Sequence, residues 1–132
     1  MDFDRIAVSD DGMPTLEGSR LRIPRRALTL LAATAFDRLS FTFTREHLEH
    51  LARVARTETN SRQDRMVSAM LLENAVIASK GVYPLCQDTG IANVIAWKDQ
   101  AIETGGNDTA AISEGIETTY RNRNLRFSTT IP

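Results

Sequence analysis

The sequence predicts an α+β fold in which three helices are followed by a strand, a fourth helix and a second strand. Before Gly81, apolar residues recur at helical spacing in three separate segments. Beyond it, residues 91–97 and 125–131 alternate in the way that is typical of strands. The dipeptide Gly105-Gly106 marks a turn between these two segments.

The first two helices are predicted from their starts and their apolar spacing. Pro24 suits a first helical turn, and the apolar residues after it place a helix near residues 24–36. Residues 40–43 alternate briefly and are interpreted as an extended link. Thr44 then has the side chain of an N-cap for a second helix near residues 45–57.

The third helix is expected near residues 62–79. Ser61 and Asp64 have the spacing of a capping box at its start, and Gly81 is placed as a C′ glycine after its end. Its apolar residues form a broad stripe, consisting of Met66, Val67, Met70, Leu71, Ala75 and Ile77.

The second half of the sequence is predicted to be mixed. Residues 91–97 carry apolar side chains on both faces, which indicates a buried strand. After the glycine turn, Asp108 or Thr109 can cap a helix near residues 109–121. The final strand, residues 125–131, stops in mid-pattern, so we expect the chain to be a fragment of a larger domain.

Composition indicates one globular domain with little attraction for polyanions. The chain has 132 residues, of which 42% are hydrophobic and 25% charged, and its net charge is −1. This balance argues against nucleic acid and anionic membrane surfaces as partners. Residues 1–20 are polar and acidic and are interpreted as an extended arm, which leaves residues 21–132 as the domain. The absence of a long apolar run or a secretory pattern predicts a cytoplasmic protein without a membrane span.

Cys86, the single cysteine, lies in the loop between the third helix and the first expected strand. It excludes an internal disulfide and a metal site built of several cysteines from this chain. A lone cysteine is usually inert core, but the residues after Cys86 are polar and end in Gly90, which lets a backbone approach a ligand. A nucleophilic role is disfavoured because Asp88 opposes the thiolate, whereas a bound metal tolerates that carboxylate. The pattern therefore favours Cys86 as one metal ligand, with the others supplied from elsewhere.

Three other polar side chains have competing interpretations. His47 and His50 could reach one metal from a helix, but they flank its apolar face among glutamates and are better interpreted as a solvated boundary. Arg126 points away from its apolar neighbours in the predicted strand. It could form a fork onto a substrate carboxylate, although an ordinary surface arginine fits the pattern better.

The residues around Cys86 resemble a known family. Residues 81–90, Gly-Val-Tyr-Pro-Leu-Cys-Gln-Asp-Thr-Gly, are similar to the Cys-Gln-Asp-Thr-Gly segment of class I, iron–sulfur fumarate hydratases of the single-chain type. Residues 104–106, 114–120 and 124–128 agree with that family in the same order. The resemblance extends from about residue 16 to the end, and its helical part is less specific. Members are far longer, so the resemblance implies an amino-terminal fragment, with residues 21–132 as the truncated start of the catalytic domain.

The resemblance implies a hydro-lyase that interconverts fumarate and (S)-malate in the tricarboxylic acid cycle. It assigns Cys86 as one of three cysteine ligands of a [4Fe–4S] cluster, which the fragment alone would not retain. It assigns Gln87, Asp88 and Arg126 to the substrate site, and Asp88 also to catalysis. It further implies a small dicarboxylate substrate and a homodimer, while the isolated fragment would be inactive.

Two alternatives stay open at the level of sequence. Ile91 stands where threonine is common in the family and Phe127 where tyrosine is common, so the substrate could be another 2-hydroxy diacid such as tartrate. The chain could also be a non-catalytic interaction domain, in which case Cys86 would be buried and unreactive.

Overall fold

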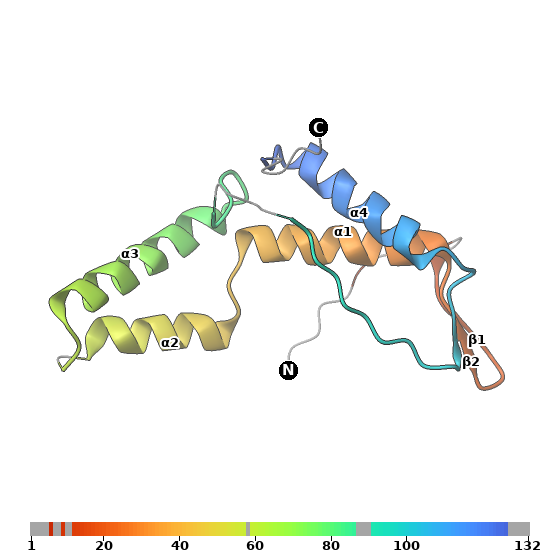
Figure 1. Cartoon of the computed structure of the whole chain (residues 1–132), viewed down its shortest axis with the longest axis horizontal. Helices are drawn as coiled ribbons and strands as arrows, with labels where there is room; N and C mark the ends of the chain where they lie inside the picture. Colours follow the sequence, from red (N-terminus) through yellow and green to blue (C-terminus); the bar gives the residue numbers. More distant parts are fainter. Residues whose placement is uncertain (1–5, 7–8, 10–11, 58, 87–90, 127–132) are drawn as a thin grey trace. The chain divides into compact units, whose positions relative to one another are not determined.

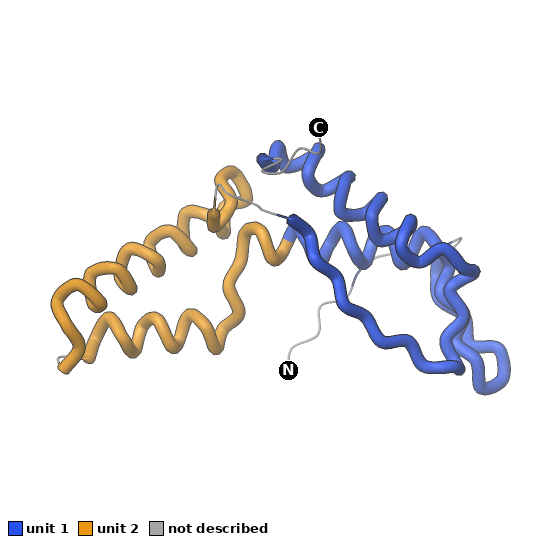
Figure 2. The backbone as a smooth tube through the Cα atoms, in the orientation of Figure 1, with its two compact units in different colours: residues 1–37, 90–132 blue, residues 38–89 orange. Residues whose placement is uncertain are grey.

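A computed structural model describes residues 6, 9, 12–57, 59–86 and 91–126 of the chain. In chain order it contains two strands, three helices, a third strand and a fourth helix (Figure 1). This confirms the predicted α+β class. The chain divides into two compact units, which are coloured separately in Figure 2: residues 1–37 together with 90–132, and residues 38–89.

The first unit contains a small three-stranded sheet in the order β1-β2-β3. Strand β1 (Thr15–Glu17) pairs antiparallel with β2 (Arg20–Arg22), and Gly18 in the turn between them has a φ of +62°. Strand β3 (Ile102–Glu103) lies parallel to β2. Much of the stretch from residue 15 to residue 20, predicted as part of an extended arm, is thus a hairpin whose backbone groups are paired.

Helix α1 (Arg25–Phe41) starts where the sequence predicts and continues past the predicted end. The prediction of an extended link at residues 40–43 is wrong for its first two residues. The helix continues because Phe41 becomes buried, with 3% of its surface exposed, and because the Thr42 N–H donates to the Arg38 carbonyl at 2.8 Å. The last turn of α1 belongs to the second unit.

Helix α4 (Asp108–Asn122) follows the predicted glycine turn. Gly105 and Gly106 have φ values of +77° and +84°, which confirms that turn. The N-cap is Asn107, not Asp108 or Thr109 as predicted. Asn107 has a φ of +54°, and its side chain accepts a hydrogen bond from the Ala110 N–H. Asparagine tolerates this left-handed conformation better than most residues, so the glycine turn can extend into the cap.

The second unit is built around an antiparallel helix pair, α2 (Arg45–Arg56) and α3 (Arg62–Ala78). Both predicted N-caps are confirmed: the side-chain oxygens of Thr44 and Ser61 each accept a hydrogen bond from the backbone N–H three residues later. After α3, Gly81 has a φ of +72° and donates its N–H to the Ala78 carbonyl, as the C′ prediction requires.

The predicted buried strand at residues 91–97 is wrong. This segment has no regular secondary structure, and Ile95 and Trp97 are 79% and 89% exposed. A strand with two apolar faces needs a neighbouring strand and a covering layer on each side, and the described part of the chain supplies neither. In the last predicted strand, Leu125 is buried, but the residues from Phe127 onward lie outside the described ones, so that strand stays a prediction.

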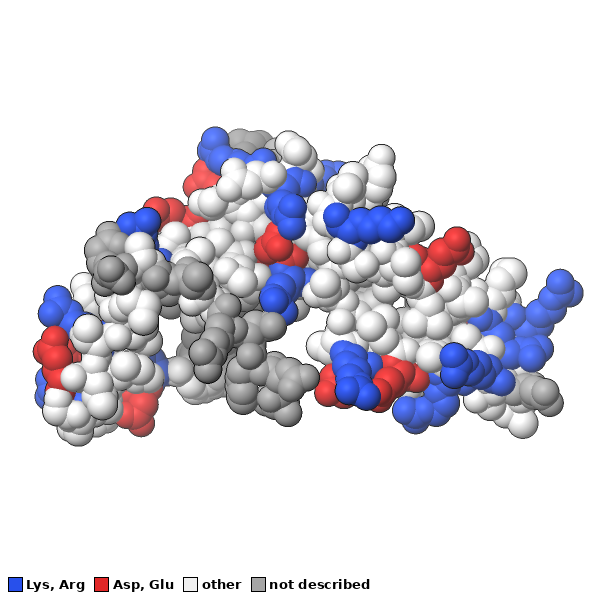
Figure 3. Space-filling model, turned by 180° about the vertical axis from the view of Figure 1, so that it is seen from behind, with Lys and Arg blue, Asp and Glu red and all other residues white. Residues whose placement is uncertain are grey.

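The core of the described residues is made mainly of small side chains, and none of its large ones is fully buried. Acidic residues lie beside basic ones on the surface in Figure 3, in keeping with the nearly balanced charge. Among the described helices, none is long and apolar enough to cross a membrane.

Candidate functional site

Cys86 lies at the end of a short loop that leaves α3 at Gly81 and turns back along it. Its thiol is exposed and is not part of a disulfide. The positive φ of Gly81 sets the direction of this turn, which a residue with a Cβ would adopt only with strain. Cys86 thus lies in a loop after the third helix, as predicted, and the structure adds that it is exposed.

The residue before Cys86 is held from two sides. The Leu85 N–H donates to the Ser40 carbonyl in the last turn of α1 at 2.8 Å. The Leu85 carbonyl accepts a hydrogen bond from the Asn74 Nδ2 of α3, also at 2.8 Å. Both backbone groups of Leu85 are therefore satisfied within the second unit. The sequence analysis did not identify Asn74, because nothing in the helical pattern distinguishes this amide from other polar positions.

Gln87 and Asp88, the predicted neighbours of Cys86 in the substrate site, lie outside the described residues. Their assigned roles remain predictions. No cluster of three or more His, Cys, Asp or Glu residues within the described ranges could hold a metal ion by itself. His47 and His50 are both exposed, and the His47 ring packs on Phe43 with the ring centroids 4.5 Å apart.

Arg126 is an exposed residue of the first unit, just beyond the end of α4. Two contacts fix the backbone leading to it. The Leu125 N–H donates to the Tyr120 carbonyl at 2.9 Å, and Leu125 itself is 4% exposed. Arg123 forms an ion pair with Asp37 of α1, and this hydrogen-bonded carboxylate raises the pKa of the Arg123 guanidinium. Cys86 belongs to the other unit, so each of these predicted site residues is described within its own unit.

A cluster that the sequence analysis missed joins Lys98 to the start of α4. The Lys98 Nζ donates to the Thr104 Oγ1 at 2.9 Å and to the Asp108 Oδ2 at 2.7 Å. The hydrogen bond from Lys98, followed by one from Thr104, holds the pKa of the Asp108 carboxyl below its usual value. Asp108 is in the first turn of α4, where a carboxylate also interacts well with the helix dipole. The cluster ties the irregular segment before it to α4.

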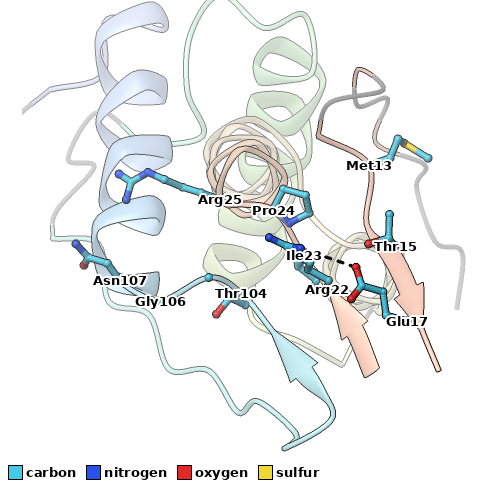
Figure 4. A pocket seen from close by; sticks show the side chains of 11 residues that line it. Met13, Thr15, Glu17, Arg22, Ile23, Pro24, Arg25, Thr104, Gly106 and Asn107 are labelled. Atoms are coloured by element: carbon cyan, nitrogen blue, oxygen red, sulfur yellow. Dashed lines mark ion pairs between the residues drawn. The ribbon is translucent and has the colours of Figure 1, made fainter. Parts of the chain in front are cut away.

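The first unit also has an open cavity of about 730 Å³ between the hairpin, the start of α1 and the glycine turn (Figure 4). Its two arginines are paired with acids: Arg22 with Glu17 at 3.8 Å, and Arg25 with Glu114 at 2.8 Å. Arg126, the predicted site residue that is described in this unit, does not line it. Its paired charges have an evident structural role in holding the hairpin and the two helices.

Comparison with known proteins assigns the chain to a family. A sequence profile of the family described as fumarate hydratase (fumerase) matches residues 29–132, which include Cys86 and Arg126. The chain belongs to the fumarate hydratase family. The resemblance seen in the residues around Cys86 is thereby confirmed.

Individual relatives agree with this assignment. The chain is 42% identical over 112 residues to the aerobic class I fumarate hydratase of Escherichia coli (strain K12), which covers 85% of the chain and 20% of the relative. It is 38% identical over 125 residues to the anaerobic class I enzyme of the same strain, with 95% and 22% covered. Fumarate hydratase 2 of Leishmania major is 42% identical over 110 residues, with 83% and 19% covered. The chain spans about a fifth of the length of these relatives.

Proposed function

We propose that this chain is the amino-terminal part of an iron–sulfur fumarate hydratase, a hydro-lyase that reversibly adds water to fumarate to give (S)-malate. The observation that carries the proposal is the family match over residues 29–132, combined with an exposed Cys86 thiol in the matched region. A small dicarboxylate is then the substrate.

The chemistry of Cys86 fits a ligand of a [4Fe–4S] cluster. Iron–sulfur clusters are bound through thiolates, and this thiol is exposed at the end of an anchored loop. The chain contains one cysteine, so it would supply one of the three ligands, and the other two would come from the remainder of the longer protein. When bound, such a cluster supplies a Lewis acid that makes the leaving hydroxyl less basic.

The remaining proposed roles belong to the chain's own polar residues. Arg126 would bind a substrate carboxylate through two parallel N–H donors, which fixes the orientation of the diacid as well as its charge. Gln87 would donate and accept hydrogen bonds to the substrate. Asp88 would accept or deliver a proton close to the reacting carbon, as the catalytic residue of this segment. The support for these three roles is their place in the matched region.

The assembly and location of the longer protein are also proposals. The resemblance to class I enzymes supports a homodimer in the tricarboxylic acid cycle. An exposed thiol outside a disulfide suits a reducing compartment, which supports a cytoplasmic location.

The proposal is tested with the longer protein purified without oxygen. We expect a brown, iron-loaded enzyme that consumes fumarate and loses colour and activity together in air. Cys86→Ser should remove both iron and activity. Full activity in Cys86→Ser would contradict the assignment of Cys86, and a colourless, inactive protein after cluster reconstitution would limit the family likeness to the fold.

A panel of diacids separates the alternative substrate from fumarate. If tartrate or another 2-hydroxy diacid is dehydrated faster than malate, the reaction class stands and the substrate changes. Ile91, which motivates this alternative, is exposed in the irregular segment, while Phe127 lies outside the described residues. An interaction domain with a buried Cys86 finds no support, since the thiol is exposed.

A further inference from the structure

Among the described residues of the loop that carries Cys86, Leu85 is hydrogen-bonded through both of its backbone groups. Its N–H donates to the Ser40 carbonyl at 2.8 Å, and its carbonyl accepts from the Asn74 Nδ2 at 2.8 Å. The first partner is backbone and is available in any sequence that forms α1. The second is a side chain, so this half of the anchor depends on the identity of one amino acid.

The Asn74 bond acts on Cys86 through the geometry of the peptide group. The Leu85 carbonyl oxygen lies in the same rigid plane as the nitrogen and Cα of Cys86. A hydrogen bond that fixes this oxygen therefore restricts where the Cα of Cys86 can lie and in which direction its side chain leaves the backbone. The Ser40 bond acts on the preceding peptide plane and leaves this one free to rotate.

Asn74 is also an unusual choice for its position. It lies in the interior of α3, where asparagine forms helix less readily than alanine or leucine. It is half-buried, and a half-buried amide is tolerated when its donors and acceptors are used. The bond to Leu85 uses one of the two N–H donors of the amide.

We propose that Asn74 is a positioning residue that sets the place and direction of the Cys86 thiolate through the Leu85 carbonyl. The proposal rests on the assignment of Cys86 as a cluster ligand. Asn74 itself would touch neither cluster nor substrate.

The first test uses the 132-residue chain and does not require the cluster. While both bonds are present, Leu85 can leave Ser40 only if its bond to Asn74 also breaks. In Asn74→Ala the bond to Ser40 alone holds this residue, so the amide hydrogen of Leu85 should exchange about three- to tenfold faster, the change expected when one hydrogen bond no longer resists opening. Because Cys86 is the single cysteine, a nitroxide attached to it reports on this loop alone. Its spectrum should show faster motion in Asn74→Ala.

Asn60→Ala is the matched control. The Asn60 Nδ2 donates to the Val54 carbonyl at 3.1 Å, is also half-buried, and lies in the same unit without contacting the Cys86 loop. This substitution should leave the exchange of Leu85 and the nitroxide spectrum unchanged. Equal effects of Asn74→Ala and Asn60→Ala would overturn the proposal, because the change would then reflect general loosening of the unit.

Asn74→Asp guards against simple misfolding of the alanine variant. It keeps the size of the side chain and removes its N–H donors, so it should reproduce the effects of Asn74→Ala while circular dichroism shows unchanged helix content. If Asn74→Asp folds and leaves Leu85 exchange unchanged, the proposal fails.

The second test uses the longer protein. It separates the assignment of Cys86 as a cluster ligand from that of Asn74 as a positioning residue. Asn74→Ala should lose iron to a chelator several-fold faster than the parent or Asn60→Ala, and Cys86→Ser should hold no cluster. If Cys86→Ser loses its iron and Asn74→Ala retains it as the parent does, the positioning role alone is overturned. If Cys86→Ser keeps its iron, the ligand assignment fails, and with it any role of Asn74 toward the cluster, whatever Leu85 exchange shows.

Discussion

The contact of α1 with α4 and that of α2 with α3 are built from different kinds of side chain. Three of the four buried residues of α4 are small: Ala111, Gly115 and Thr119. A Cβ placed on Gly115 would lie 2.2 Å from the Thr29 carbonyl oxygen and 2.9 Å from the Ala32 Cβ. The Thr119 hydroxyl donates to the Ala33 carbonyl at 3.0 Å. Ion pairs at either end, formed by Arg25 with Glu114 and by Arg123 with Asp37, add to this contact.

The α2–α3 pair buries Leu51 of α2 together with Ser68 and Ala78 of α3, and it is less completely filled. Leu51 is buried, but an apolar groove of about 570 Å³, lined in part by Leu48 and Leu72, remains open on this pair. The exposed apolar side chains of α3 are Met66, Val67, Met70, Leu71, Val76 and Ile77. The difference shows that Gly115 allows a close contact between the α1 and α4 backbones, while the α2–α3 pair leaves much of its apolar surface exposed and is looser. The close contact should therefore tolerate the least change.

The largest expected effect is that of Gly115→Ala. Alanine normally favours a helix over glycine by about 1 kcal/mol, but the new methyl group would overlap the Thr29 backbone oxygen, which cannot move cheaply. We expect a net loss of about 3 kcal/mol in the free energy of unfolding. Urea unfolding followed by circular dichroism measures it, with the exposed Ser113→Ala as control. Unchanged stability would show that the two helices separate without cost.

Leu51→Ala tests the looser pair. The side chain is 7% exposed, and removing most of it should cost about 2 kcal/mol, at the low end for buried leucines because the neighbouring groove lets the site collapse. Met70→Ala, at a side chain that is 61% exposed, should change the unfolding free energy by less than about 0.5 kcal/mol. A loss with Leu51→Ala as large as that with Gly115→Ala would remove the contrast between the pairs.

Ser61→Ala should cost about 1 kcal/mol. The Ser61 Oγ accepts a hydrogen bond from the Asp64 N–H at the start of α3, and alanine leaves this donor without its cap. Gln63→Ala in the same helical turn makes no such change and serves as control. Thermal unfolding measures the melting temperatures of both variants, and that of Ser61→Ala should be the lower. Equal melting temperatures would show that water fully replaces the hydrogen bond of the cap.

The smallest effect is expected from the Lys98–Thr104–Asp108 cluster, as a pH dependence. The folded-state pKa of Asp108 lies below its ordinary value of 3.8, so the stabilisation is present above that value and is lost as the pH falls through the folded pKa. Asp108→Asn should lower the melting temperature slightly at neutral pH and have less effect in acid. Because both side chains are partly exposed to solvent, added salt should reduce the difference. An effect of Asp108→Asn that is independent of pH would contradict this assignment.

The sequence was sufficient to predict those structural features whose hydrogen bonds join residues close together in the chain. The caps Thr44 and Ser61 and the turn at Gly81 were predicted because each acts on backbone within a few residues. The irregular conformation of residues 91–97 was not predicted. Whether such a segment forms a strand depends on neighbouring strands, and its own pattern of apolar residues does not specify these. The predicted apolar positions of α4 missed the packing role of Gly115, since a glycine carries no hydrophobic signal.

The residues of the candidate site also differ in whether the sequence alone could identify them. Cys86 was found from the polar residues around it, and its exposure agrees with the interpretation as a ligand. Asn74 could not be found, since its partner is a backbone carbonyl 11 residues away and the sequence does not record which carbonyl a loop presents.

The anchoring of Leu85 bears on the order of events during synthesis. Ser40, Asn74 and Leu85 all lie within residues 38–89, and no later residue takes part in these hydrogen bonds. Amino-terminal units commonly fold while the ribosome is still translating the remainder of a chain. The Cys86 loop could therefore be set on its two helices while later residues are still being translated. Nascent-chain experiments with arrest points far enough beyond residue 89 for residues 38–89 to have left the ribosomal tunnel would then find the thiol already in its final conformation.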